Sequence, residues 1–212
     1  MEVNDSIRSK VETKLNHSMD TVGGIGKYAY ALQMPEAELI KLISNKTVLD
    51  VGSGKGGFAK ECALKKIPSK VFSVNARIAF PDFREKEMAA TSKITDGVDT
   101  ERVQKEHDSK VVPSVAQELP FKSEAFDLVL DFMAATHYSN NDSFRTIAEE
   151  MYRVTKKGGE VIIFADFSAE FDNERMYKDR ALILKELEIP YKELRHDGYG
   201  IPEGFRITKP EA

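Results

Sequence analysis

Cysteine and long apolar runs are both scarce in this sequence of 212 residues, in which Cys62 is the one cysteine. A single cysteine cannot form an intramolecular disulfide, and it cannot supply the thiolates of a cysteine-based zinc site. No apolar stretch reaches the roughly 20 residues that a membrane-spanning helix needs. Residues 1–17 contain no apolar core of the kind that secretory signals carry. These absences favour a cytoplasmic protein without a membrane partner.

An excess of positive charge is absent as well. The sequence has 31 lysines and arginines against 35 aspartates and glutamates, a formal net charge of -4. Because proteins whose main role is to hold DNA or RNA usually carry a basic face, we expect no nucleic-acid partner. The hydrophobic content of 41% and the charged content of 31% are typical of a globular protein. The length suits a single domain over residues 1–212.

The spacings that mark metal sites are also missing. There is no H-E-x-x-H motif, and the acidic residues and histidines are scattered along the chain. Asp131 is followed by Asn140, Asn141 and Asp142, but this group is too dispersed to form a compact carboxylate cluster. We therefore predict no metal site.

From Thr47 onwards, short apolar runs alternate with stretches of helical periodicity. The predicted strands cover 47–51, 70–75, 110–115, 126–134 and 160–167, and the predicted helices cover 57–66, 143–157 and 174–188. This alternation predicts an α/β fold in which a parallel sheet is covered by helices on both faces. Two last strand-like pieces, 191–196 and 205–208, have no long helix between them and predict an antiparallel pair at one edge.

The first 45 residues form a distinct part of the chain, which we predict to be a helical extension or lid over the core at 46–212. Periodic apolar residues predict a helix over 6–16, and a second helix is predicted to begin near Pro35. Between them, residues 21–32 combine three glycines with Tyr28 and Tyr30. Glycine hinges and aromatic rings fit a gating segment, but tyrosines at this spacing fit ordinary packing, which is the preferred interpretation.

Residues 81–110 are highly charged and only weakly periodic. Long connections of this kind are either functional loops or solvated insertions. The segment is therefore interpreted either as a solvated insertion or as a loop that covers a substrate.

A glycine-rich turn separates the strand at 47–51 from the helix that follows it, and its glycines are Gly52, Gly54, Gly56 and Gly57. Glycine permits positive φ angles and lets a ligand approach the backbone closely. The turn lies at the carboxyl end of a strand, where open α/β sheets bind ligands, and it opens a helix whose N–H groups are available. Lys55 lies inside the turn and no G-K-[ST] follows, so a nucleoside triphosphatase of the P-loop type is not expected. A nicotinamide dinucleotide and S-adenosylmethionine both remain candidate ligands.

Three stretches resemble the class I S-adenosylmethionine-dependent methyltransferases, and among these the enzymes that act on small molecules. "VLDVGSGKGGFA" at 48–59 resembles the first motif of that family, an acidic residue followed by G-x-G-x-G. "AQELPFKSEAFDLVL" at 116–130 and "MYRVTKKGGEVIIFADF" at 151–167 resemble its fourth and fifth strands with their preceding segments. The resemblance implies a Rossmann-like, doubly wound sheet of seven mainly parallel strands. It also implies methyl transfer from S-adenosyl-L-methionine to a small-molecule acceptor.

The resemblance further implies which residues bind the cofactor. In the family, the glycine turn passes under the methionine part and the ribose, a role that falls here to Asp50, Gly52, Ser53 and Gly54. The residue that closes the second strand holds the ribose, and the segment before the fourth strand and the end of that strand complete the pocket. The corresponding residues are Asn75, Ala116, Gln117, Asp131 and Phe132.

Two positions depart from the family pattern. Asn75 replaces a carboxylate that accepts from both ribose hydroxyls, and Val115 replaces an acidic residue that accepts from the adenine amino group. If Asn75 holds the ribose, Asn75→Asp is expected to keep or tighten cofactor binding. Asn75 followed by Arg77 also suits the 2′-phosphate of NADP, so an NADP-dependent oxidoreductase is an alternative. A binding module that has lost most or all of its cofactor affinity is another.

His137 is the candidate catalytic base. It follows the fourth strand, whose end faces the methyl group in the family, and its ordinary pKa suits proton removal near neutral pH. Methyl transfer needs a base only when the acceptor must lose a proton, so no catalytic residue is obligatory. A histidine that hydrogen-bonds the loop backbone is the alternative interpretation.

Overall fold

The computed structural model describes residues 24–54, 56–76, 110–137, 139–164, 173–195 and 202–211. The predicted helix over 6–16 lies outside these residues, and so does almost all of the charged segment at 81–110. Within the described residues, no helix combines the length and the apolar composition that a bilayer crossing requires.

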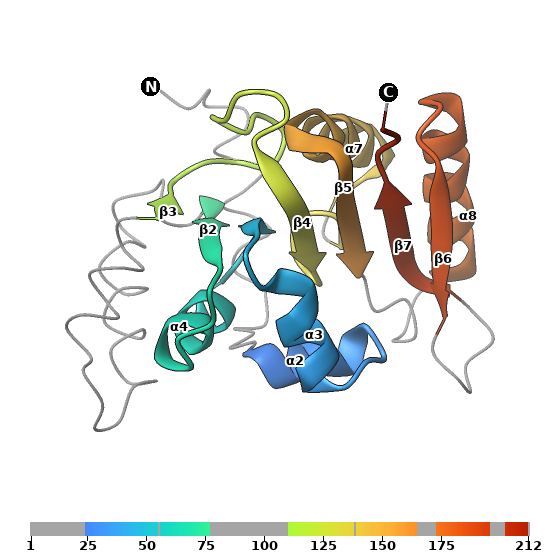
Figure 1. Cartoon of the computed structure of the whole chain (residues 1–212). Coiled ribbons are helices and arrows are strands. Elements are labelled where there is room, and N and C mark those ends of the chain that lie inside the picture. Colours follow the sequence, from blue (N-terminus) through green and yellow to red (C-terminus); the bar gives the residue numbers. More distant parts are fainter. Residues whose placement is uncertain are drawn as a thin grey trace.

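One seven-stranded sheet organises the described chain (Figure 1), with the strand order β3-β2-β1-β4-β5-β7-β6. Its strands are β1 (Thr47–Val51), β2 (Lys70–Val74), β3 (Val111–Val112), β4 (Phe126–Phe132), β5 (Thr155–Phe164), β6 (Tyr191–Arg195) and β7 (Pro202–Thr208). The first five strands pair in parallel, and β7 runs antiparallel to both β5 and β6. This arrangement confirms the predicted fold class, including the antiparallel pair at the C-terminal edge.

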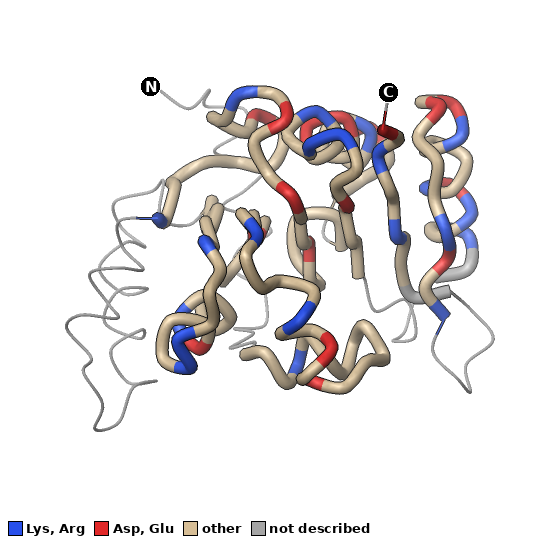
Figure 2. The backbone as a smooth tube through the Cα atoms, in the orientation of Figure 1, with Lys and Arg blue, Asp and Glu red and all other residues tan. Residues whose placement is uncertain are grey.

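Helices cover both faces of the sheet. One face carries α7 (Asn141–Val154) and α8 (Asn173–Glu186), and the other carries α2 (Ile25–Ala31), α3 (Glu36–Ile43) and α4 (Gly57–Leu64). In Figure 1, α2 and α3 lie next to the arrowheads of β4 and β5, at the carboxyl edge of the parallel strands. Figure 2 shows acidic and basic residues interspersed along α8, which fits the low net charge of the sequence.

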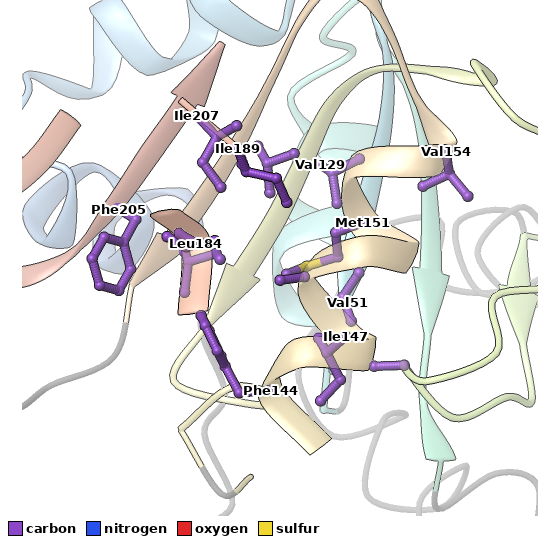
Figure 3. Packing of buried hydrophobic residues seen from close by; sticks show 14 of the residues in the cluster. Val51, Val129, Phe144, Ile147, Met151, Val154, Leu184, Ile189, Phe205 and Ile207 are labelled. Atoms are coloured by element: carbon purple, nitrogen blue, oxygen red, sulfur yellow. The ribbon is translucent and has the colours of Figure 1, made fainter. Parts of the chain in front are cut away.

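Alternation along the strands separates the apolar residues into two cores. Leu49 and Val51 of β1 belong to the core under α7 and α8, whereas Val48 belongs to the core under α2, α3 and α4. Figure 3 shows the first of these cores, in which Met151 of α7 packs among residues of the strands. Burying each large apolar side chain contributes about 1.5–3 kcal/mol, so both helix layers are held mainly by the apolar faces of the sheet.

The structure corrects one predicted boundary. The helix predicted over 143–157 ends at Val154, and β5 already begins at Thr155. Thr155 pairs with Phe126 of β4, and Lys156 forms an ion pair of 2.7 Å with Asp127 of the same strand. Pairing with β4 therefore overrides the pattern of lysines and glycines that suggested the end of a helix. The double glycine lies inside the strand, where Gly158 has a φ of 71°.

Two smaller differences concern the ends of the sheet and the N-terminal part. The strand predicted over 110–115 is confined to Val111 and Val112. The glycine-rich stretch at 21–32, for which no element was predicted, contains a helix, α2, that packs against α3 and α4. The helix predicted near Pro35 is present, and Pro35 is its N-cap residue.

Candidate functional site

The glycine turn after β1 adopts the backbone conformation that its sequence predicts. Gly52, Gly54 and Gly56 all have positive φ angles, of 71°, 53° and 71°. The backbone N–H groups of Gly52 and Ser53 both donate to the carbonyl of Val74, at 2.8 and 3.1 Å. The turn is therefore fastened to the end of β2, the neighbouring strand, and it leads directly into α4.

Asn75, the residue after Val74, fastens the same turn through its side chain. Its side-chain Nδ2 donates a hydrogen bond of 2.6 Å to the carbonyl of Gly54, and the residue is buried. The amide thus serves here as a donor to the turn. Aspartate at this position would place a carboxylate oxygen against the carbonyl of Gly54, which argues against the expectation that Asn75→Asp tightens cofactor binding.

Asp50, at the end of β1, is completely buried. Its Oδ1 accepts a hydrogen bond of 2.7 Å from the hydroxyl of Tyr28, while Oδ2 has no hydrogen-bond partner among the described residues. Burial raises the pKa of Asp50 to about 7; the bond from Tyr28 acts in the opposite direction, and the nearby charge of Asp131 adds to the rise. A buried acceptor without a donor is uncommon in folded proteins and costs about 1–3 kcal/mol, so this atom indicates a ligand position.

The ring of Tyr28, whose hydroxyl bonds Asp50, is part of a stack of four aromatic rings. Its ring lies between Phe58 of α4 and Phe132 of β4, with centroid distances of 4.4 and 4.6 Å. Phe132 stacks in turn on Phe164 of β5, at 5.3 Å. The stack joins α2 and α4 to the ends of β4 and β5.

Asp131 occupies the end of β4, beside Val51 of β1. Its two carboxylate oxygens accept from the backbone N–H groups of Ala135 and Thr136, at 3.0 and 2.8 Å. Burial raises the pKa of Asp131 to about 6, although the hydrogen bonds from Thr136 and Ala135 and the charge of Arg180 act in the opposite direction. Because neighbouring residues on a strand point to opposite faces, Asp131 faces α7 and α8, whereas Phe132 faces α2.

The loop after β4 carries His137 and packs on the glycine turn. Met133 begins this loop with a φ of 48°, an uncommon conformation for a residue with a side chain. A Cβ atom placed on Gly52 would lie 2.3 Å from the Cβ of Ala134, so glycine at position 52 is what allows the two segments to touch. His137 itself is half-buried.

A buried arginine supports the far end of that loop. Arg180 of α8 donates to the carbonyl of Ser139 at 3.2 Å and lies over the ring of Phe144, 5.1 Å from its centroid. Burial lowers the pKa of Arg180 to about 10, and the charge of Asp131 acts in the opposite direction. Arg180 is therefore a cation held inside the protein beside the Asp131 carboxylate.

The segment before β4, which includes Ala116 and Gln117, is clamped to α7 by an ion pair. Arg153 bonds both oxygens of Glu150 at 2.6 and 2.8 Å, and it also donates to the carbonyls of Leu119 and Phe121. Glu150 accepts from the backbone N–H of Leu119 at 2.8 Å. Ala116 is buried and Gln117 is partly exposed.

The structure brings most of the predicted site residues to one edge of the sheet. Asp50, Gly52, Ser53, Gly54 and Asn75 surround the turn between β1 and β2. The neighbouring end of β4 contributes Phe132, Asp131 and, through the loop, His137. Ala116 and Gln117 follow β3, the strand beside β2.

Sequence reasoning missed three contributors to this site. Tyr28 carried a signal, since an aromatic residue followed the glycines, but nothing in the sequence paired it with Asp50. In the sequence, Arg180 and Arg153 resemble ordinary arginines on a helix surface. In the structure, Arg180 is buried and Arg153 donates to the backbone of a distant loop. Arg77, on which the NADP interpretation depends, lies outside the described residues. Within the described residues, no group of three or more histidine, cysteine or acidic side chains could hold a metal ion.

Comparison with protein families gives the class of the chain. The family model described as a methyltransferase domain matches residues 49–163, more than half of the sequence. The chain therefore belongs to this family, and the resemblance to the class I S-adenosylmethionine-dependent methyltransferases is confirmed. The match spans the glycine turn, β4 and nearly all of β5. A comparison with curated proteins finds no match.

Solved structures show the same fold at low sequence identity. A protein of Methanococcus maripaludis, described as a proposed S-adenosylmethionine-dependent methyltransferase, superposes with a TM-score of 0.59 at 14% identity, covering 89% of this chain and 88% of its own. A SAM-dependent methyltransferase of Aquifex aeolicus gives a TM-score of 0.52 at 18% identity, with 81% and 85% covered. The 1,6-didemethyltoxoflavin-N1-methyltransferase of Burkholderia thailandensis, solved with bound 1,6-didemethyltoxoflavin and S-adenosylhomocysteine, gives a TM-score of 0.54 at 16% identity, with 98% of this chain and 86% of its own covered.

We expect Asn75→Asp to weaken the binding of S-adenosylhomocysteine and to lower the free energy of unfolding by about 1–3 kcal/mol. The physical reason is repulsion between the new carboxylate and the carbonyl of Gly54, which now accepts from Nδ2. Calorimetric titration and urea unfolding measure the two effects. Asn45→Asp, at an exposed position before β1, is the matched control and is expected to change neither quantity. Tighter binding by Asn75→Asp would show that the carboxylate acts on the ligand instead.

We expect the free energy of unfolding to fall between pH 5 and pH 8. The pKa of Asp50 is raised from 3.8 to about 7 in the folded state, so the folded protein is stabilised by the protonated form of this residue. That stabilisation is complete below pH 4 and is lost as the pH rises through 7. The contribution of this one group is on the order of 4 kcal/mol at most. Asp50→Asn keeps an acceptor for Tyr28 but cannot ionise, so urea unfolding across this range should show a flatter profile.

The pKa of Asp131 is also raised, to about 6, so this residue too lowers the free energy of unfolding as the pH rises. Part of the slope should therefore persist in Asp50→Asn. Asp142→Asn, on the exposed first turn of α7, is the control and should keep the wild-type slope. An unchanged slope in Asp50→Asn would contradict the raised pKa of Asp50.

Proposed function

We propose that this protein transfers the methyl group of S-adenosyl-L-methionine to a small-molecule acceptor in the cytoplasm. The observation that carries the proposal is Asp50, whose buried Oδ2 has no donor within the described part of the chain and lies beside a glycine turn with three positive φ angles. The family match and the strand order β3-β2-β1-β4-β5-β7-β6 support it, because the turn then lies where open α/β sheets bind ligands.

The residues at this edge fit the proposed cofactor. The carboxylate of Asp50 suits the ammonium of the methionine part, and Gly52, Ser53 and Gly54 offer a backbone that a ligand can approach closely. Asn75 shapes the turn on the ribose side through its bond to Gly54.

Further from the turn, Ala116 and Gln117 suit the adenine, and the Glu150–Arg153 ion pair holds their segment in place. Phe132 contributes an apolar wall at the end of β4. Asp131 contributes by fixing the loop that follows it, because Ala135 and Thr136 occupy its oxygens.

S-adenosyl-L-methionine supplies an electrophilic methyl group on a sulfonium when it is bound. The chain's own part is to place the acceptor atom in line with that methyl, at about 3–3.5 Å, and to exclude water. His137 is the proposed base for acceptors that must lose a proton, since its loop packs on the glycine turn through Ala134. Asp131 and Arg180 hold that loop at its two ends.

Two considerations support a small-molecule acceptor. The net charge of -4 does not favour a nucleic-acid substrate. The structurally similar enzyme from Burkholderia thailandensis, whose fold this chain shares, acts on a small heterocycle. The acceptor atom is a matter for substrate screening once cofactor binding is established.

We expect calorimetric titration to show binding of S-adenosylhomocysteine in the micromolar range and no binding of NADP⁺ under the same conditions. Gly52→Ala is the matched variant: its Cβ would clash with Ala134 in a strained backbone conformation, so it should lose most of the affinity. Binding of NADP⁺ alone would replace the proposal by an NADP-dependent oxidoreductase. Binding of neither would replace it by an interaction module of the methyltransferase fold.

His137→Ala should lower turnover on an acceptor found by screening by about 100-fold or more, the usual contribution of a general base. Affinity for S-adenosylhomocysteine should stay within twofold of wild type, because the proposed role concerns the acceptor. Steady-state kinetics and calorimetry measure the two quantities. Turnover that is unchanged would remove His137 from the mechanism and leave the cofactor assignment intact.

A further inference from the structure

Tyr28 is held rigidly at the edge of the proposed site. Its ring is stacked between Phe58 and Phe132, with interplanar angles of 22° and 24°. The helix that carries it is anchored at its first residue, where the N–H of Ile25 donates to Oε2 of Glu61 at 2.7 Å. The position of the Tyr28 hydroxyl is therefore set by three elements, α2, α4 and β4.

The hydroxyl of Tyr28 acts as a donor toward Asp50. Burial and the neighbouring Asp50 carboxylate raise the pKa of Tyr28 well above its ordinary value, so the hydroxyl keeps its proton throughout the physiological range. The bond of 2.7 Å to Oδ1 fixes one half of the carboxylate. A carboxylate with one oxygen fixed can rotate little, and its second oxygen is thereby aimed in one direction.

Among the described residues, no hydrogen-bond donor reaches the second oxygen of Asp50. The groups that shift the pKa of Asp50 are Tyr28, a neutral donor, and Asp131, a second carboxylate. An ionised carboxylate in such a place needs a positive partner, and a primary ammonium group offers both the charge and the N–H donors. The ligand group expected beside Oδ2 of Asp50 is therefore a primary ammonium group.

We propose that Tyr28 is a positioning residue, which holds Oδ1 of Asp50 so that Oδ2 accepts from an α-ammonium group of the ligand. This inference rests on the proposed function and deepens it. It assigns the recognition of the amino-acid part of the cofactor to the Tyr28–Asp50 pair. The Tyr28–Asp50 pair should therefore not affect the binding of a ligand that has the same nucleoside and thioether but no amino-acid part.

The test compares two ligands on three proteins. S-adenosylhomocysteine carries the α-ammonium group, whereas 5′-methylthioadenosine has the same nucleoside thioether without it. Tyr28→Phe removes the hydroxyl and keeps the stacked ring, and Tyr30→Phe, on the same helix and 72% exposed, is the matched control. Calorimetric titration gives the six dissociation constants.

Wild-type protein should bind S-adenosylhomocysteine more tightly than 5′-methylthioadenosine. Tyr28→Phe should weaken S-adenosylhomocysteine by about tenfold or more, as expected for a hydrogen bond to a charged group, and leave 5′-methylthioadenosine within twofold. Tyr30→Phe should leave both affinities unchanged. Asp50→Asn, which keeps the acceptor but loses the charge, should reproduce the selective loss and serves as the second variant if Tyr28→Phe does not fold.

Three results would overturn the inference. An equal loss of both ligands in Tyr28→Phe would show a purely structural role, and no loss of either would show no role. Equal wild-type affinity for both ligands would remove the ammonium contact and leave the proposed cofactor in place. Failure of the wild-type protein to bind either ligand would instead reject the proposed function itself, so the two failures are distinguishable.

Discussion

The position of β1 between β2 and β4 is the constraint on which the rest of the structure depends. β1 pairs in parallel with β2 on one side and β4 on the other, so the carboxyl ends of three strands come together. Parallel strands need long crossovers, and the helices that supply them bury both faces of the sheet. The turn after β1, Asn75 after β2 and the loop after β4 thus become neighbours although they lie far apart in the sequence.

Features that cost free energy gather at this same edge. Two carboxylates, Asp50 and Asp131, are buried there, and Met133 adopts a left-handed backbone conformation. Each feature opposes folding unless the surroundings compensate for it, and such features cluster at functional sites. Asp131 is compensated by backbone N–H groups and Arg180, while Asp50 is compensated only in part, by Tyr28. The difference separates a carboxylate that supports the loop from one that remains available to a ligand.

Local pattern was sufficient to predict the sheet, because each parallel strand is a short apolar run between turn residues. It was sufficient for the glycine turn too, since positive φ angles leave a direct mark in the sequence. Contacts between distant segments leave no such mark. Nothing in the sequence pairs Tyr28 with Asp50, or Arg153 with the segment before β4, and pairing of Lys156 with Asp127 converted a predicted helix end into strand. Asn75 was predicted to close the second strand and hold the ribose, and its bond to Gly54 became visible only in three dimensions.

The aromatic stack of Phe58, Tyr28, Phe132 and Phe164 also ties together segments that lie far apart in the sequence. The four rings come from α2, α4, β4 and β5, and α2 is the element that stands first in the sequence. Tyr28 can take its place in the stack only when α4 and β4, which supply the two rings beside it, are in position. The helix that covers the edge of the sheet assigned to ligand binding is therefore held there by segments that come after it in the sequence, and its buried residues are part of the core beneath it.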